Sequence, residues 1–122
     1  MSSPCGSQIV LVVDDEQPIA EMVAAILRKS GYVAHIAHNG EEALHFLDTI
    51  TPHVLISDMM MPGMNGVQLA VEVRKRCPEC RIALCSGAAS PENALREARR
   101  QGYDFRFFKK PFHPPDLLRS IS

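Results

Sequence analysis

Aspartates follow two apolar segments of the chain, and their spacing suits metal-assisted chemistry on phosphorus. Asp14 and Asp15 follow residues 9–13, and Asp58 follows residues 54–57. If these segments are neighbouring strands, the three carboxylates converge within a few ångströms, and two such charges 4 Å apart repel by about 4 kcal/mol at an effective dielectric constant of 20. Uptake of a proton or binding of a hard cation relieves this repulsion, and carboxylates without His or Cys favour Mg²⁺ over zinc. A carboxylate beside Mg²⁺ can also attack phosphorus and form an aspartyl-phosphate.

A hydroxyl and an amine follow two further apolar segments. Ser86 follows residues 82–85, and Lys110 follows residues 105–108, with Lys109 between them. The charge on phosphoryl oxygens needs a cation and a hydroxyl donor, which Lys110 and Ser86 could supply. The competing explanation treats Asp14 and Asp15 as a helix-capping pair and Asp58 as a loop residue. It can explain each position separately, but it does not explain why all three aspartates follow predicted strands.

Short apolar runs alternate with amphipathic stretches, which predicts five strand–helix units. The run IVLVV is continuous, as is typical of a strand buried on both faces of a parallel sheet. The predicted fold is a doubly wound α/β sandwich, in which ligands bind beyond the carboxyl ends of the strands. Neither a G-x-G-x-x-G motif nor a P-loop is present. The pattern predicts strands over residues 9–13, 32–37, 54–57, 82–85 and 105–108, and helices over 17–30, 41–49, 67–76, 90–101 and 114–122.

Length, composition and charge favour one globular domain. The chain has 122 residues, of which 46% are hydrophobic, and 13 basic against 14 acidic residues leave a formal charge of −1. We expect a flexible leader over residues 1–7 and a single domain over residues 8–122. The balanced charge gives no footprint for direct nucleic-acid binding, no apolar run is long enough to span a membrane, and no secretory signal is recognisable. A cytoplasmic location is therefore expected.

Cys77 and Cys80 form a C-x-x-C motif, which we interpret as a turn between a helix and a strand. A structural zinc site needs four ligands, and no second pair lies at a suitable spacing. Thioredoxin-like chemistry would place the motif at a helix start after a strand, whereas this motif follows a helix. In a reducing cytosol we expect free thiols.

Four motifs, in this order and spacing, resemble the receiver domain of two-component response regulators over about residues 8–121. The pattern Asp-x-x-Met-Pro-x-Met-x-Gly after a short apolar strand is highly specific for that family. The resemblance implies a flavodoxin-like fold, with a five-stranded parallel sheet of strand order 2-1-3-4-5. The motifs are Val12-Val13-Asp14-Asp15, the segment DMMMPGMNG at residues 58–66, Ser86-Gly87 and Lys110-Pro111-Phe112.

The resemblance implies a role for each residue of the acidic group. Asp58 matches the phosphoacceptor of the family. Asp14 and Asp15 match the acidic pair that holds Mg²⁺, directly or through water, together with Asp58 and the backbone carbonyl of Met60.

The resemblance implies further roles for residues near the ends of the last two strands. Ser86 matches the hydroxyl that binds the phosphoryl group, and Lys110 matches the lysine that pairs with its oxygens. Phe107 matches the switch aromatic that rotates inward on activation, with Phe108 as the competing candidate, because the segment between Gly102 and Lys110 is one residue longer than usual.

The function implied by the resemblance is a phosphorylation-activated signalling switch. A sensor histidine kinase or a phosphotransfer protein would donate to Asp58, and the face formed by helix four, strand five and helix five would change. That face would bind a downstream effector or a second copy of the chain. The chain would catalyse its own phosphorylation without being an enzyme. Its autodephosphorylation would be slow, because the side chains of Met60 and Ala88, which flank the path of the attacking water, cannot orient it.

Two alternatives come from other classes of protein. A haloacid-dehalogenase-type phosphatase needs Asp-x-Asp after its first strand, whereas Asp14 and Asp15 are adjacent. A degenerate receiver that acts as a constitutive interaction module would lack part of the site, whereas every expected residue type is present.

Overall fold

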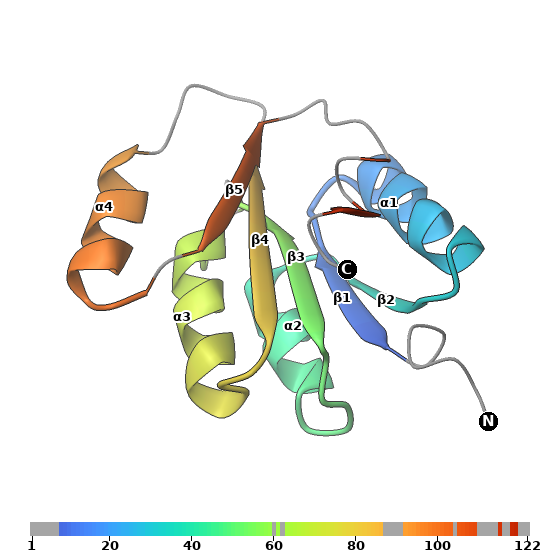
Figure 1. Ribbon diagram of the computed structural model, residues 1–122, viewed down its shortest axis with the longest axis horizontal. Helices are drawn as coiled ribbons and strands as arrows, with labels where there is room; N and C mark the ends of the chain where they lie inside the picture. The colour runs from blue at the N-terminus through green and yellow to red at the C-terminus, as the bar shows by residue number, and fades with distance from the viewer. Residues whose placement is uncertain are drawn as a thin grey trace.

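The computed structural model describes residues 8–59, 61, 63–86, 92–103, 105–109, 115, 118 and 119. Strands and helices alternate throughout this part of the chain (Figure 1). None of the described helices has the length and apolarity that a membrane span requires. The elements are β1 (Ile9–Val13), α1 (Gln17–Lys29), β2 (Val33–Ala37), α2 (Gly40–Phe46), β3 (Val54–Asp58), α3 (Gly66–Arg76), β4 (Arg81–Ser86), α4 (Glu92–Arg100) and β5 (Arg106–Lys109).

The five strands form one sheet of order β2-β1-β3-β4-β5, and every neighbouring pair is parallel. This confirms the predicted doubly wound sheet and its strand order. The registers pair Val13 with Ser57, Asp58 with Cys85, and Ser86 with Lys109. The carboxyl ends of the strands therefore meet at one edge of the sheet, where the predicted site residues either end the strands or follow them.

Helices cover both faces of the sheet (Figure 1). The buried side chains of β1 alternate between the two faces. Leu11 and Val13 of β1 are buried in the cluster that includes residues of α2, α3 and α4. Val10 and Val12 are buried in the other cluster, beneath α1. Because both faces of β1 are covered, the continuous apolar run IVLVV is explained.

The bounds of several helices differ from the predicted ones, and at the end of α2 local hydrogen bonds explain the difference. The helix predicted over 41–49 is α2, which ends at Phe46, because the next three residues close tighter turns: the N–H groups of Leu47, Asp48 and Thr49 donate to carbonyls three residues earlier at 3.0 to 3.1 Å. The fourth helix begins at Glu92 in the described residues, and positions 90 and 91 lie outside them. Of the predicted last helix, only residues 115, 118 and 119 are described, all with helical backbone.

The last strand begins one residue later than predicted. Phe105, expected to open it, precedes β5 and is buried by a stack of side chains. Its ring lies 5.7 Å from the ring of Tyr103, and the Arg74 guanidinium carbon lies 5.5 Å from its centroid. At its other end β5 extends one residue further than predicted, to Lys109, and Lys110 is the next residue of the chain.

Candidate functional site

Three carboxylates from two neighbouring strands gather at the carboxyl edge of the sheet. One carboxylate oxygen each from Asp14, Asp15 and Asp58 lies within 4.8 Å of the others. Asp14 is 4% exposed and Asp58 is 8% exposed, whereas Asp15 faces solvent. The predicted convergence of the three side chains is confirmed, and within the described part of the chain no other cluster of potential metal ligands occurs.

The loop after β1 holds Asp14 by its backbone and its side chain. Its N–H donates to the carbonyl of Ala37 in β2 at 3.1 Å, and its Oδ1 accepts the N–H of Glu16 at 2.9 Å. The N-cap residue of α1 is Glu16, and its side chain makes no capping bond. Neither Asp14 nor Asp15 is therefore the N-cap residue, which removes the helix-capping explanation for the pair.

Backbone contacts on both sides hold the chain at Asp58. The N–H of the next residue, Met59, donates to the carbonyl of Cys85 in β4 at 2.8 Å. The Met59 carbonyl in turn accepts the N–H of Gly66, the first residue of α3, at 3.0 Å. The loop after Asp58 is thereby fixed between β4 and the start of α3.

Gly66 allows α3 to begin directly against this loop. A Cβ atom at position 66 would lie 2.7 Å from the Cα of Met59 and still closer to the carbonyl oxygen of Asp58. The preceding residue, Asn65, closes a capping box with Gln68: each side chain accepts the other residue's N–H, at 2.8 and 2.9 Å. Gly66 has no individual role among the sequence-based predictions, although its place at the end of the specific motif was a signal.

Ser57 is another residue without a predicted role. It is fully buried, and its hydroxyl donates to the carbonyl of Asp58 at 3.0 Å. A lone hydroxyl within the apolar strand before Asp58 was the signal for it.

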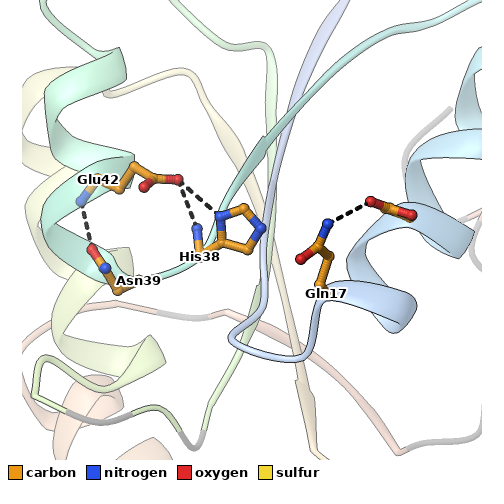
Figure 2. A network of polar contacts seen from close by, with 5 residues as sticks. Gln17, His38, Asn39 and Glu42 are labelled. Atoms are coloured by element: carbon orange, nitrogen blue, oxygen red, sulfur yellow. Dashed lines mark hydrogen bonds and ion pairs between the residues drawn. The ribbon is translucent and has the colours of Figure 1, made fainter.

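A pocket of about 490 Å³ adjoins the acidic cluster and is lined in part by Asp15, His38, Asn39 and Met64. Figure 2 shows its His38–Asn39 edge at the start of α2. The Glu42 carboxylate accepts the His38 N–H at 2.9 Å and lies 3.3 Å from His38 Nδ1, while Asn39 Oδ1 accepts the Glu42 N–H at 2.7 Å. These bonds order the end of β2, where the sequence indicated nothing strongly reactive.

The structure places the remaining predicted site residues only in part. Ser86 ends β4 opposite Lys109 in register. Met60 and Lys110 lie outside the described residues. Phe107 is half-buried, pairs with Leu84 in register and packs against the cluster on the α3 side of the sheet, whereas nothing can be said of the Phe108 side chain.

The donor set of the acidic cluster suits a hard divalent cation. All three groups are carboxylates, two of them are largely buried, and their oxygens are close enough to share one ion. Oxygen ligands of this kind favour Mg²⁺ or Ca²⁺ over zinc. Asp58 is the group at this cluster that ends the central strand β3 and could act as a nucleophile.

The doubly wound sheet and the acidic cluster at its carboxyl edge are the features that the resemblance to receiver domains implies, and comparison with known sequences supports that family. The model of the response regulator receiver domain matches residues 10–122. The chain therefore belongs to the response regulator receiver family.

Individual relatives share the family but differ in length. The chemotaxis protein CheY of Thermotoga maritima is 32% identical over 114 residues, which cover 93% of each chain. The regulatory protein AtoC of Escherichia coli is 32% identical over 108 residues, which cover 88% of this chain but only 23% of AtoC. The chain thus spans about a quarter of AtoC.

Solved structures show the same fold. A response regulator of Burkholderia pseudomallei, solved with a phosphorylated aspartic acid, a calcium ion and citrate, superposes with a TM-score of 0.83 at 26% identity. The match covers 94% of this chain and 66% of that one.

Proposed function

We propose that Asp58 accepts a phosphoryl group from a phosphohistidine of a sensor kinase or a phosphotransfer protein, and that the resulting aspartyl-phosphate switches the domain between two states. The observation that carries this proposal is the burial of Asp58 at the end of β3, with its carboxylate within 4.8 Å of those of Asp14 and Asp15. Membership of the receiver family supports it, as does the phosphorylated aspartic acid in the Burkholderia pseudomallei relative.

The transfer replaces one bond to phosphorus by another. A carboxylate oxygen of Asp58 attacks the phosphorus, the phosphorus–nitrogen bond breaks, and the electron pair leaves with the imidazole of the donor. The buried β3 backbone and the bond from Met59 to Cys85 hold Asp58 in place for this attack. No turnover is proposed, since the chain itself is the acceptor.

The transfer brings phosphoryl oxygens to a place that already holds three carboxylates, so positive charge is required there. Asp14, Asp15 and Asp58, with the backbone carbonyl of Met60, are the proposed ligands of Mg²⁺, which when bound neutralises charge on the phosphoryl oxygens. The bond from Glu16 to Asp14 keeps one ligand oriented.

Ser86 and Lys110 are the proposed partners of the phosphoryl oxygens. β4 and β5 end side by side at Ser86 and Lys109, which supports this assignment because Lys110 follows directly. Phe107, half-buried on β5, is the proposed switch aromatic.

The proposed output surface is the face of α4, β5 and the helix that follows. A downstream effector or a second copy of the chain would bind there when Asp58 is phosphorylated. We place the chain and its donor in the cytoplasm. The aspartyl-phosphate would be lost slowly, since neither Met60 nor Ala88 has a side chain that can orient an attacking water.

Incubation with acetyl phosphate and Mg²⁺, followed by intact-mass measurement, tests this function. The wild type should gain the mass of one phosphoryl group, and the gain should disappear when Mg²⁺ is chelated. Asp58→Asn should abolish it. Asp48→Asn is the matched control, because Asp48 is an exposed aspartate just after α2 and outside the acidic cluster. An unchanged gain in Asp58→Asn, or none in the wild type, would refute the proposal.

A further inference from the structure

The C-x-x-C motif lies at the end of the sheet opposite the acidic cluster and contributes no residue to that cluster. Cys77 is the C-cap residue of α3, and Cys80 immediately precedes β4. The Cys80 N–H donates to the carbonyl of Cys77 at 3.0 Å, so the four residues close a β-turn with Pro78 in its second position. The first and last Cα atoms of a β-turn lie less than about 7 Å apart. Disulfides span Cα distances of roughly 4.4–6.8 Å, so the backbone needs little movement to bring these cysteines within bonding range.

The two side chains face the same hydrophobic cluster but differ in access. Cys80 is 3% exposed and belongs to the cluster between the sheet and α3, whereas Cys77 is half-buried and packs against its edge. Both also line a surface pocket of about 500 Å³, together with Pro52 and His53. One thiol is thus open to a reagent, and the other is sheltered beside it.

A metal site is a poorer explanation for this pair. In the described part of the chain, no third His, Cys, Asp or Glu joins Cys77 and Cys80 within ligand distance. His53 is nearby, but its Nδ1 accepts the N–H of Ile9 at 2.9 Å. Cys85 belongs to the cluster on the opposite face of the sheet. Both Cys77 and Cys80 carry free thiols in the structure.

We propose that Cys77 and Cys80 form a reversible thiol–disulfide pair, a modification site independent of Asp58, that is oxidised by a small disulfide such as glutathione disulfide. The Cys77 thiolate attacks one sulfur of glutathione disulfide and releases one glutathione. The sulfur of Cys80 then attacks the sulfur of Cys77 and releases the second. Two protein thiols and one glutathione disulfide thus give one protein disulfide and two glutathione thiols, which receive the two protons.

The environment of the thiols assigns the order of these steps. Burial, and then the neighbouring Cys77, raise the pKa of the Cys80 thiol to about 12, although the charge of Arg74 opposes this shift. Because the thiolate is the attacking species, Cys80 is a slow nucleophile and Cys77 reacts first. Cys80 then acts as the resolving thiol, and ring closure should become faster as the pH rises.

The motif can be tested on the folded wild-type chain with glutathione disulfide. Trypsin cleavage after Arg76 and Arg81 releases residues 77–81, a peptide that holds both cysteines and excludes Cys5 and Cys85. After native oxidation and alkylation of the remaining thiols, this peptide should lack the alkyl groups and the mass of two hydrogen atoms, and dithiothreitol should reverse the change. Alkylation of both cysteines in the 77–81 peptide after oxidation, or their linkage to other cysteines, would overturn the proposal.

Single cysteine variants, which cannot form the internal disulfide, distinguish the attacking thiol of Cys77 from the resolving thiol of Cys80. Cys80→Ser should stop at a mixed disulfide of Cys77 with glutathione, and Cys77→Ser should leave Cys80 unmodified over the same time. Cys5→Ser is the control and should form the 77–80 disulfide as the wild type does. Modification of Cys80 ahead of Cys77 would contradict the assigned order. Asp58→Asn should oxidise normally, which separates this proposal from the proposed phosphorylation.

Discussion

Replacing Gly66 with alanine should disturb the loop after Asp58 far more than the same change at Gly40. Both glycines are buried and are the first residues of their helices, α3 and α2, so both variants gain a similar helix propensity. The two sites differ in what the new methyl group meets. At position 66 it meets the backbone of Asp58 and Met59, whereas at position 40 it meets the side chain of Met64, whose sulfur lies 2.8 Å away.

The difference in cost follows from how each obstacle can move. At position 66 the backbone must shift by at least about 0.7 Å, the difference between the 2.7 Å to the Met59 Cα and the 3.4 Å at which ordinary contact begins, because the Asp58 carbonyl oxygen is closer still. Forcing an extra methyl group against packed structure costs about 1–3 kcal/mol, and stretching the bond from Gly66 to Met59 adds about 1 kcal/mol. At position 40 the Met64 sulfur can rotate away, and the Met64 Cβ, 3.0 Å from the new methyl group, needs to yield by only about 0.4 Å, which costs less. We therefore expect Gly66→Ala to lower the free energy of unfolding by about 2 kcal/mol more than Gly40→Ala.

Thermal melts of the two variants measure this difference. At this chain length, about 2 kcal/mol corresponds to a gap in Tm of about 8 °C. Gly66→Ala should also be phosphorylated more slowly by acetyl phosphate, since the displaced backbone carries Asp58. Equal melting temperatures for the two variants would show that the backbone beside Gly66 yields as readily as Met64 does beside Gly40, which would refute this prediction.

Three further changes test other parts of the structure. Asp15→Asn should raise the Tm of the metal-free protein and reduce its stabilisation by Mg²⁺, because it removes one of three clustered charges; a lower metal-free Tm would count against repulsion. Since burial raises the pKa of Cys80 to about 12, the folded state keeps a proton that the unfolded state loses from about pH 9. Stability should therefore fall as the pH rises through this window, and less steeply in Cys80→Ala; parallel urea-midpoint profiles for the two proteins would contradict the assignment. Met60→Asn combined with Ala88→Glu should speed the decay of phosphorylated protein after donor removal, and an unchanged decay would exclude these positions as controls of water access.

The sheet was predictable because strands that are buried on both faces appear in the sequence as continuous apolar runs. The apolar run at residues 9–13 predicted both ends of β1 correctly, because polar residues flank it and only its apolar residues can be buried on both faces of the sheet. Asp58 was expected after its strand but lies within it, paired with Cys85, because backbone pairing continues past the last apolar side chain. The late start of β5 was not predictable, since the burial of Phe105 involves Arg74 of α3, a contact between residues far apart in the sequence.

The convergence of the acidic cluster was predictable for a related reason. Parallel strands bring their carboxyl ends together, so Asp14, Asp15 and Asp58 had to meet if β1 and β3 were neighbours. The contacts that hold them were not predictable in the same way. The bond from Glu16 to Asp14 depends on the path of a loop, and the obstruction at Gly66 depends on how closely α3 approaches β3.

Chemical localisation of the phosphoryl group shows directly whether Asp58 is the phosphoacceptor. Borohydride reduces an acyl phosphate to an alcohol, so phosphorylated aspartate becomes homoserine, and tandem mass spectrometry of the digested chain locates it. We predict homoserine at position 58 and at none of the other aspartates, in samples treated with acetyl phosphate and Mg²⁺. Homoserine at Asp14 or Asp15, with unmodified Asp58, would contradict it.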